Sequence, residues 1–382
     1  MTEWKEKKLG NVAQLQKKSW QVGDKDLPYV ALEHIVEGGL RLHAIGNSKT
    51  IVSNKYHFDS DCFLFGKLRP YFRKLYRPDF EGICSTDIWV VKPKNDNDKD
   101  FLFYFFANQE FVDFTYAGSS GTRMPRADWN FVSESIWTFP KPSEQKSIAS
   151  ILSGLDDKID LLHRQNKTLE QMAETLFRQW FVVEASEEWE IATLNDVLSV
   201  KGGTTPNTKI PDYWDGDIHW TSPRDITTLN SIYLFNTEKK ITKAGLKKIS
   251  SGLLAQGTLL MTSRAPVGVL AFAEIPIAIN QGYIAIIDDK GFTKEFLYLW
   301  LKSNMDYVQS YANGSTFLEI SKTAFKSLEI QVPPKKLREE FQEMVMPVFR
   351  KIKTNQTQIL NLEKLRDTLL PKLMRGEVKV EI

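Results

Sequence analysis

Two segments of the chain carry apolar residues with a seven-residue period. In the first, from about 143 to 183, the repeated positions are separated alternately by four and three residues. Pro140 and Pro142 disfavour a helix before this segment, and Ser143 is a suitable N-cap. The pattern predicts a long helix with a seam formed by Leu155, Ile159, Leu162, Asn166, Leu169, Ala173, Leu176 and Trp180.

The second segment repeats this seam 193 residues later (348 − 155 = 193) and carries polar residues at two of its positions. A polar residue in a seam, such as Asn166, sets register and partner at some cost in stability. Pro371 and Gly376 are expected to end or kink this helix. Its seam comprises Val348, Ile352, Asn355, Ile359, Leu362, Arg366, Leu369 and Leu373.

The rest of the chain is also duplicated, with a period of about 190 residues. Trp4 and Leu9 recur as Trp189 and Leu194, and the aromatic run 101–106 recurs as 296–301. The stretch FGKLRP at 65–70 resembles MTSRAP at 261–266, with an offset of 195 between the arginines Arg69 and Arg264. A unit–helix–unit–helix chain with two-fold related copies requires the two helices to pair antiparallel, as a coiled coil. Packing of each helix inside one domain core is the alternative.

Each globular unit combines strand-like and helix-like patterns. Strands are expected within 87–91, 253–261 and 275–287, and helices at 99–116 and 294–311. We therefore expect a mixed α/β (α+β) fold with two tandem globular domains, two long antiparallel coiled-coil helices and pseudo-two-fold symmetry. The predicted boundaries are 1–142 and 186–334 for the globular domains, and 143–185 and 335–382 for the helices.

Composition and charge exclude several classes of protein. Hydrophobic residues make up 42% of the 382 and charged residues 26%, an ordinary globular balance with a net charge of only +2. No apolar run approaches the ~18–20 residues of a membrane span, and two cysteines cannot build a disulfide framework. We expect a reduced, metal-free, cytoplasmic protein. The helical segments carry opposite charge: 143–188 has 5 basic and 9 acidic residues (−4), and 335–382 has 11 and 7 (+4).

Motifs for several catalytic chemistries are missing from the sequence. It contains no GxGxxG, P-loop or GxSxG, and neither a glycine-rich S-adenosylmethionine loop nor an NPPY-like tetrapeptide. Pro211-Asp212 with Glu238-x-Lys240 fits a loose pattern for a Mg²⁺-dependent nuclease, but such a short pattern arises often by chance. A nuclease is therefore kept as an enzyme alternative.

Nine short motifs are spread along the whole chain. They are LGNV at 9–12, FGKLRPY at 65–71, EQKSIASIL at 144–152, LDDKI at 155–159, GGTTP at 202–206, YWDGDIHW at 213–220, TSRAPVG at 262–268, INQG at 279–282 and LLPKLMRGEV at 369–378. Together these motifs resemble the DNA specificity subunits of type I restriction-modification enzymes. The second helix departs from that family by having Lys335-Lys336-Leu337-Arg338-Glu339-Glu340 where Pro-x-x-Glu-Gln is usual.

This resemblance implies a function and a set of partners. Each globular unit would be a target recognition domain that reads one half of a bipartite site in double-stranded DNA. The helices would space the domains and dock two methyltransferase subunits, which carry S-adenosylmethionine, and restriction subunits would join this core. The chain itself would be non-catalytic, would hold no cofactor or metal, and would have no membrane partner. The alternatives are an enzyme, either a nuclease or a single-chain restriction–methylation fragment, and a coiled-coil scaffold that does not bind DNA.

Candidate DNA-binding residues come from basic stretches, polar loops and the matching motifs. Residues that both units share cannot read two different half-sites, so Arg69 and Arg264 are expected to contact phosphate or to support the fold. Unshared loop residues, Arg123 and Arg126 against Phe317 and Glu319, are better candidates for reading bases. The full candidate set is Lys67, Arg69, Tyr71, Arg73, Thr122, Arg123, Arg126, Ser222, Arg224, Arg264, Gln281, Ser315 and Thr316, with Lys239, Lys240 and Lys243 as further basic residues.

Candidate partner-binding residues lie at the ends of the helices, at matching positions of the repeat. These positions would present similar surfaces twice. They are Phe177, Trp180, Phe181, Leu370, Leu373 and Met374.

Overall fold

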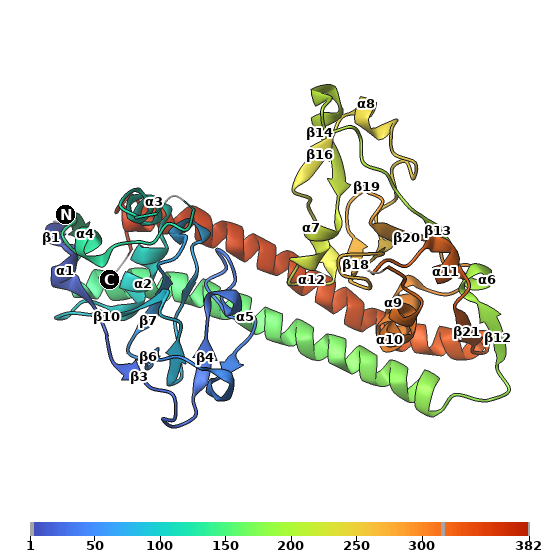
Figure 1. The fold of residues 1–382 in the computed structure, drawn as a ribbon, viewed down its shortest axis with the longest axis horizontal. Helices are drawn as coiled ribbons and strands as arrows, with labels where there is room; N and C mark the ends of the chain where they lie inside the picture. Colours follow the sequence, from blue (N-terminus) through green and yellow to red (C-terminus); the bar gives the residue numbers. More distant parts are fainter. Residues whose placement is uncertain (1–3, 122, 315–317, 381–382) are drawn as a thin grey trace. The chain divides into compact units, whose positions relative to one another are not determined.

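The structure is a computed structural model that describes residues 4–121, 123–314 and 318–380. The chain divides into two compact units, unit 1 (Met1–Leu161 with Ile359–Ile382) and unit 2 (Leu162–Gln358). Two long helices, α5 (Pro142–Arg178) and α12 (Lys335–Met374), each contribute one part to each unit (Figure 1). No helix among the described residues is long and apolar enough to cross a membrane.

Unit 1 contains two sheets and a short strand pair. The first sheet has the order β2-β10-β7-β8 and the second β3-β6-β9-β4-β5, while β1 pairs antiparallel with β11. The strands are β1 (Lys5–Lys8), β2 (Ala13–Leu15), β3 (Ser19–Trp20), β4 (Pro28–Val30), β5 (Gly46–Asn47), β6 (Lys55–Phe58), β7 (Phe63–Gly66), β8 (Leu75–Tyr76), β9 (Gly82–Cys84), β10 (Ile88–Pro93) and β11 (Ile136–Phe139). The helices are α1 (Leu9–Val12), α2 (Lys99–Ala107), α3 (Gln109–Ala117) and α4 (Trp129–Ser133), with short 3-10 turns at Leu32–His34, Ser48–Thr50 and Pro70–Phe72.

Unit 2 also contains two sheets and a short strand pair. Its sheets are β13-β20-β17-β18-β15 and β16-β14-β19, and β12 pairs antiparallel with β21. The strands are β12 (Glu190–Thr193), β13 (Ser199–Lys201), β14 (Trp214–Thr221), β15 (Tyr233–Leu234), β16 (Lys239–Ile241), β17 (Thr258–Thr262), β18 (Leu270–Ala273), β19 (Ala278–Ile279), β20 (Tyr283–Asp288) and β21 (Glu329–Val332). The helices are α6 (Leu194–Val197), α7 (Pro223–Thr227), α8 (Lys243–Leu246), α9 (Lys294–Ser303), α10 (Met305–Ser310) and α11 (Lys322–Lys326), and a 3-10 turn spans Pro211–Tyr213.

The expected mixed α/β fold with a duplicated unit is confirmed. The series β1-α1-β2, then β7, β8 and β10, then α2-α3-α4-β11 and a long helix, recurs as β12-α6-β13, then β17, β18 and β20, then α9-α10-α11-β21 and a long helix. The helices expected at 99–116 and 294–311 are wrong in detail, because each is two helices that break at Asn108 and Asn304. The pseudo-two-fold relation of the units stays a prediction.

Both long helices are confirmed, and their predicted ends need correction. Helix α5 begins at Pro142 rather than at a Ser143 cap, which the first turn tolerates because its N–H groups have no helical partner. Helix α12 continues past Pro371 to Met374, and Gly376 follows at a φ of +68°. A glycine in this conformation is a common helix C-cap. After α5 the chain makes one π-helical turn, Gln179–Val183, which the heptad pattern did not reveal.

The predicted seam is the contact between the two helices within each unit. In unit 2, the Asn355 side chain donates a hydrogen bond from Nδ2 to Oδ1 of Asn166 at 2.9 Å, and both residues are buried. In unit 1, Arg366 on α12 forms an ion pair with Asp156 on α5, with Nη1 and Oδ1 2.8 Å apart. Within unit 2, Asn166 meets Asn355 and Phe177 meets Phe341, with ring centroids 5.9 Å apart, so residue numbers fall along one helix as they rise along the other and the paired segments are antiparallel.

Aromatic side chains fill the core around helices α2 and α9. Every residue of α2 from Phe101 to Ala107 is buried, as is every residue of α9 from Phe296 to Leu301. In unit 1 the ring of Phe106 packs against Phe63, Phe65 and Phe111 at centroid distances of 4.4–5.7 Å. Aromatic pairs at these distances add stabilisation beyond their buried area. The core therefore fixes the first sheet of each unit, whose strand ends position the candidate site.

Candidate nucleic-acid interface

A polar loop in unit 1 is closed by backbone hydrogen bonds beside the end of β7. The backbone N–H of Ser120 donates to the carbonyl of Arg126 at 3.0 Å, and the N–H of Arg126 donates back at 2.9 Å. Arg126 also forms a β-bridge with Leu68, just after β7. We call the closing position of this loop, Arg126, the loop mouth of unit 1. Because backbone groups make these contacts, the loop mouth is held whatever its side chain.

A loop in unit 2 is closed by the same set of backbone contacts, here called the frame of the loop mouth. Asn313 and Glu319 exchange backbone hydrogen bonds at 2.9 and 3.0 Å, and Glu319 forms a β-bridge with Arg264, just after β17. Glu319 is therefore the loop mouth of unit 2, at the position that Arg126 occupies in unit 1.

Each loop mouth carries an exposed ion pair. Arg126 donates from Nε to Oδ1 of Asp87 at 3.0 Å and from Nη2 to Oδ2 at 3.5 Å. This carboxylate raises the pKa of Arg126, so the guanidinium stays charged. In unit 2, Nη1 of Arg264 lies 3.6 Å from Oε2 of Glu319. Side chains at the two loop mouths are 46% and 45% exposed, which leaves polar atoms of both available to a ligand.

The predicted alignment of Arg69 with Arg264 is wrong by one residue. Lys67 donates from its backbone to the carbonyl of Asp87 and accepts from Ala127, while Ser263 donates to Gly282 and accepts from Ile320. Lys67 and Ser263 are thus equivalent, which places Arg264 opposite Leu68. The true counterpart of Arg69 is Ala265: both have left-handed φ values, 51° and 55°, and both precede a proline. An arginine shared by both units is therefore absent from this turn.

Residues of the basic stretch 67–77 differ in what they contact. The Nη2 group of Arg73 donates to the Gly38 carbonyl at 3.0 Å and to Asp367 of α12 at 3.3 Å. The guanidinium of Arg69 lies 6.0 Å from the Phe72 ring, and Tyr71 is 43% exposed with its ring edge against Phe72. Arg73 therefore ties its turn to α12, whereas the Tyr71 ring packs against Phe72 and Tyr116 and stays partly exposed. Contact of Lys67, Arg69, Tyr71 and Arg73 with DNA stays a prediction.

In unit 2, the predicted residues outside the loop lie around helix α7. Ser222 is the N-cap of α7 and shares a capping box with Asp225. Arg224 is 78% exposed, with Nε 3.9 Å from Glu238. Gln281 accepts a hydrogen bond from the Thr205 hydroxyl at 2.7 Å. Of the remaining candidates, Arg123 is exposed, and Thr122, Ser315 and Thr316 lie outside the described residues.

Most of the predicted partner-binding side chains are covered by their own unit. Phe177 and Phe181 pack against Phe296 and Phe341 in unit 2, and Trp180 is half-buried beside them. Leu370, Leu373 and Met374 are 1%, 1% and 6% exposed in the core of unit 1. Exposed apolar residues near these positions include Val182 and Val183, at 51% and 63%, and Val378, at 37%. Partner contact stays a prediction, and these exposed valines are better placed to make it.

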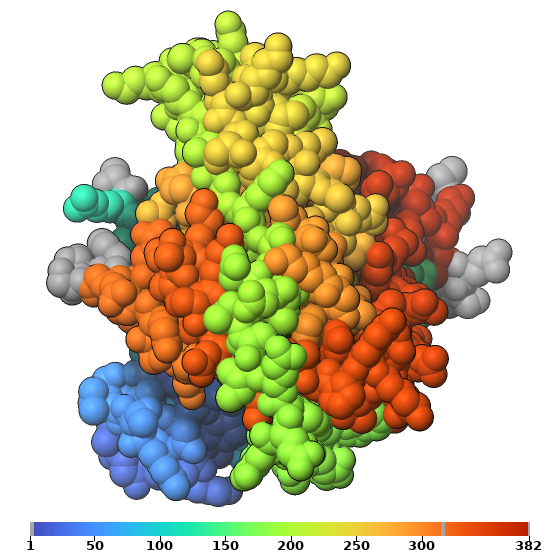
Figure 2. All heavy atoms as spheres, turned by 90° about the vertical axis from the view of Figure 1, so that its right-hand side faces the viewer, coloured from blue at the N-terminus to red at the C-terminus, as the bar shows by residue number. Residues whose placement is uncertain are grey.

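Sequence reasoning recovered only part of a lysine-rich surface on unit 2. Strands β14 and β16 and helix α8 form a lobe at the far end of the unit from α9 and α10 (Figure 1), seen in yellow-green and yellow in Figure 2. The lobe has its own small core around Trp220 and Ile241. Five exposed lysines lie on it, and among the described residues none of them forms an ion pair: Lys239, Lys240, Lys243, Lys247 and Lys248, here called the lysine lobe. Alternation of these lysines with apolar residues over 239–249 was the available signal.

Aromatic rings support two of these ammonium groups. Lys239 Nζ lies 5.5 Å from the centroid of Trp214, and Lys248 Nζ lies 5.9 Å from that of Tyr213. Cations over aromatic faces are attracted by the ring quadrupole. The five lysines outnumber the exposed carboxylates Asp215 and Asp217 of β14 and form no ion pair among the described residues, so the lysine lobe can attract a polyanion.

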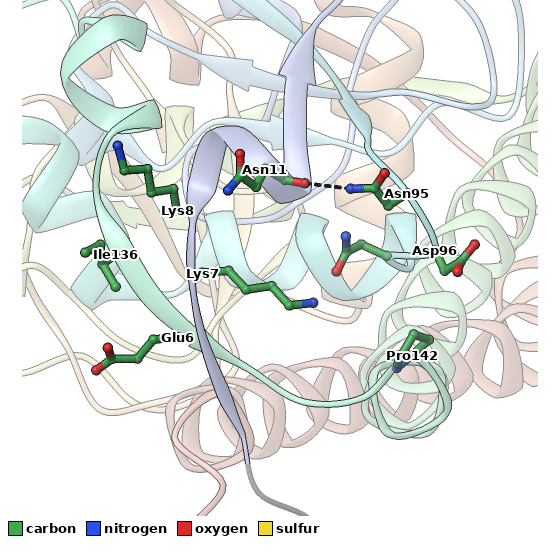
Figure 3. Close-up of a pocket in the computed structure, with 9 residues that line it drawn as sticks. Glu6, Lys7, Lys8, Asn11, Asn95, Asp96, Ile136 and Pro142 are labelled. Atoms are coloured by element: carbon green, nitrogen blue, oxygen red, sulfur yellow. Dashed lines mark hydrogen bonds between the residues drawn. The ribbon is translucent and has the colours of Figure 1, made fainter.

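A cavity of about 530 Å³ in unit 1 lies where β1, the loop before α2 and the start of α5 meet (Figure 3). Asn95 closes one wall by donating from Nδ2 to the Asn11 carbonyl at 3.0 Å. Neither this cavity nor any other described region brings together three His, Cys, Asp or Glu side chains that could hold a metal ion. Among the described residues, Asp212 and Glu238 of the loose nuclease pattern therefore do not belong to a cluster of this kind.

The family motif at the start of α5 has a structural explanation. Gln145 is fully buried, donates to the Pro140 carbonyl at 3.0 Å and accepts from the Asp98 backbone at 2.8 Å. At the matching position of α12, Arg338 donates from Nε to the Pro333 carbonyl at 3.1 Å and covers the Phe292 ring at 4.1 Å. The unusual start of the second helix therefore fastens the same preceding proline by a different side chain.

Comparison with known proteins is consistent with this repeated architecture. A family model described as the type I restriction modification DNA specificity domain matches residues 1–171 and again 186–364. The specificity subunit of the type I restriction enzyme MjaIX of Methanocaldococcus jannaschii is 37% identical over 162 residues, which are 42% of this chain and 38% of that subunit. The specificity subunit of HindI from Haemophilus influenzae is 23% identical over 461 aligned residues, covering 99% of this chain and all of that subunit.

A solved structure has the same fold. The S subunit of a type I restriction-modification system from M. genitalium matches with a TM-score of 0.58 at 15% identity, over 97% of this chain and 96% of that one. Since the family model covers most of both halves, this chain belongs to the type I restriction-modification DNA specificity family.

Proposed function

We propose that this chain is the DNA-binding specificity subunit of a type I restriction-modification complex, in which each unit reads one half of a bipartite site. The observation that carries the proposal is the repeated loop mouth, where one backbone frame holds Arg126 in unit 1 and Glu319 in unit 2. A frame that is kept while its exposed side chain changes is suited to reading different sequences. Base edges are distinguished by the side chains that reach them.

The proposed partners follow from the same repeat. Two methyltransferase subunits, each carrying S-adenosylmethionine, would dock on the two halves, because repeated elements present similar surfaces twice. Restriction subunits would join this core, and the chain itself would contribute recognition without catalysis. With a net charge of +2, the chain neutralises few phosphates, so tight binding would depend on these partners.

Exchange of one unit tests the proposal. Residues 1–142 are replaced by the corresponding segment of another family member, and the chain is expressed with its methyltransferase partner in cells whose methylated adenines are sequenced. We expect the first half of the methylated site to change and the second half to stay. The matched control exchanges 186–334 and should change the second half only. A change in both halves from one exchange, or no bipartite site with the unaltered chain, would contradict the proposal.

A further inference from the structure

We propose that the loop mouth reads one base pair in each half-site, Arg126 contacting guanine in the half read by unit 1 and Glu319 contacting cytosine in the half read by unit 2. This inference rests on the proposed function and assigns its base-reading positions. The loop mouth has equivalent backbone contacts in both units and side chains of opposite charge. No single residue of the basic stretch or of the lysine lobe has such a counterpart.

The first argument is the geometry of the frame. In each unit the loop mouth pairs through its backbone with the residue six positions earlier and with the residue that follows the matching strand. These contacts hold the Cα of Arg126 and that of Glu319 in the same local surroundings. A substitution there changes the chemistry offered to a ligand while the backbone contacts remain. Such positions can vary between half-sites without a cost in fold.

The second argument is the orientation of the side chains. Asp87 engages the Nε and one Nη group of Arg126, which fixes the plane of the guanidinium. Five N–H donors are carried by an arginine, so donors remain for a second planar acceptor. Guanine presents two acceptors, O6 and N7, in the major groove and is the usual target of arginine. A carboxylate that orients the guanidinium beforehand reduces the ordering cost of that contact.

The third argument is the reversal of charge at Glu319. A carboxylate only accepts hydrogen bonds, and cytosine N4 is the matching donor in the major groove. Nη1 of Arg264 lies 3.6 Å from Oε2 of Glu319, beyond hydrogen-bond distance, and the Glu319 side chain is 45% exposed, so acceptor sites of the carboxylate remain open. In a common frame, an arginine and a glutamate would select opposite bases of a G·C pair. The two units would thus read that pair in opposite orientations.

The experiment uses the full chain with its methyltransferase partner and sequences methylated adenines in cells carrying each variant. Arg126→Gln should reduce discrimination at one position of the first half-site by about 10- to 100-fold and leave the second half unchanged. Glu319→Gln should do the same in the second half only. The double variant Arg126→Glu with Asp87→Arg reverses the charges of the ion pair in unit 1, gives its loop mouth the residue that stands in unit 2, and should favour cytosine where guanine was required.

Lys8→Gln is the matched control, because Lys8 also forms an exposed ion pair in unit 1, 2.7 Å from Glu134, away from the loop. It should leave every position of the methylated site unchanged, and thermal melting of each purified complex checks folding. An unchanged site in the folded Arg126→Gln and Glu319→Gln variants would overturn the inference, as would a uniform loss of methylation at all sequences. If the unaltered chain and Lys8→Gln give no bipartite site, the proposed function itself fails.

Discussion

Arg366 is a buried guanidinium whose charge is balanced within unit 1. It is 2% exposed and its Nη1 lies 2.8 Å from Asp156, whose other oxygen accepts from the Tyr104 hydroxyl at 2.7 Å. Burial raises the pKa of Asp156, and Arg366 and Tyr104 counteract that rise. A buried pair of this kind is expensive to break, since removal of one partner leaves an uncompensated charge.

Replacement of Arg366 by alanine should destabilise the protein strongly. We expect Arg366→Ala to lower the free energy of unfolding by about 3–5 kcal/mol, as for other broken buried pairs. Measurement by urea denaturation at pH 7 checks this value. At the equivalent positions of unit 2, 193 residues away in each helix, Ala173 and Phe349 are both buried in an apolar core. The double variant Asp156→Phe with Arg366→Ala copies that layer and should be less destabilised than Arg366→Ala alone.

The cost of Arg366→Ala should also depend on pH. Without Arg366 the pKa of Asp156 rises further above its unfolded value, so the folded state binds a proton that the unfolded state has lost. Stability then falls as pH rises from the unfolded pKa of about 4 through the folded pKa. The difference in unfolding free energy between wild type and Arg366→Ala should therefore be larger at pH 7 than at pH 5. Equal differences at both values would show that Asp156 is not the group left unpaired.

At the scale of residues, the sequence predicts a side-chain pair only when both of its members fall on the heptad pattern. Asn166 and Asn355 both occupy seam positions, so their buried polar layer follows from the heptads. Asp156 lies outside the seam, and its pairing with Arg366 was therefore not predictable from periodicity. Arg69 and Arg264 were matched by identity alone, and the backbone hydrogen bonds show that identity misplaced them by one residue.

At the scale of elements, the long helices were predictable and the variable sheets were not. A heptad pattern over many turns is a strong signal, whereas strands such as β3, β5 and β15 have two residues and no period. Breaks at Asn108 and Asn304 were missed because the aromatic pattern continues across them. The sheet β3-β6-β9-β4-β5 of unit 1 and β16-β14-β19 of unit 2 differ most, and so does the surface that they carry.

The lysine lobe should contact phosphates rather than bases. Lysine is a flexible point charge, so its contacts with DNA carry little sequence information. We expect Lys243→Gln, Lys247→Gln and Lys248→Gln together to weaken binding of the complex to all DNA sequences alike. Each lost phosphate contact should reduce the slope of log affinity against log salt concentration by about 0.9. Titration of labelled duplexes at several salt concentrations measures the slope.

A control that removes two positive charges elsewhere on unit 2 separates local contact from overall charge. Lys335 and Lys336 are exposed lysines of unit 2 at the start of α12, each paired with a glutamate four residues later. Their replacement by glutamine should leave the salt slope nearly unchanged. If the lobe variant alters the methylated sequence, or if both sets of variants reduce the slope equally, the lysine lobe is not a phosphate-binding surface.

At the scale of the whole molecule, the helices connect the two units in sequence and can act as a ruler. Helix α5 is unbroken from Pro142 to Arg178 and α12 from Lys335 to Met374, and each belongs to unit 1 at one end and to unit 2 at the other. The length of an α-helix grows by ~1.5 Å with each residue that is added. The number of unspecified base pairs between the half-sites, which dimeric readers commonly place one DNA turn (~10 base pairs) apart, should therefore follow helix length.

Matched insertions in both helices test this ruler. Seven residues after Arg164 and seven after Gln356 keep the heptad phase and lengthen each helix by ~10 Å, about three base-pair steps. We expect methylome sequencing to show a longer spacer between two unchanged half-sites. Four-residue insertions at the same points rotate the seam on one side of the insertions by ~40° against the seam on the other side. They should mainly reduce stability, because the buried pair Asn166 with Asn355 and the buried pair Asp156 with Arg366 then no longer lie on one continuous seam. A folded, active seven-residue variant with an unchanged spacer would show that the helices do not set the distance, and would assign that role to the partner subunits.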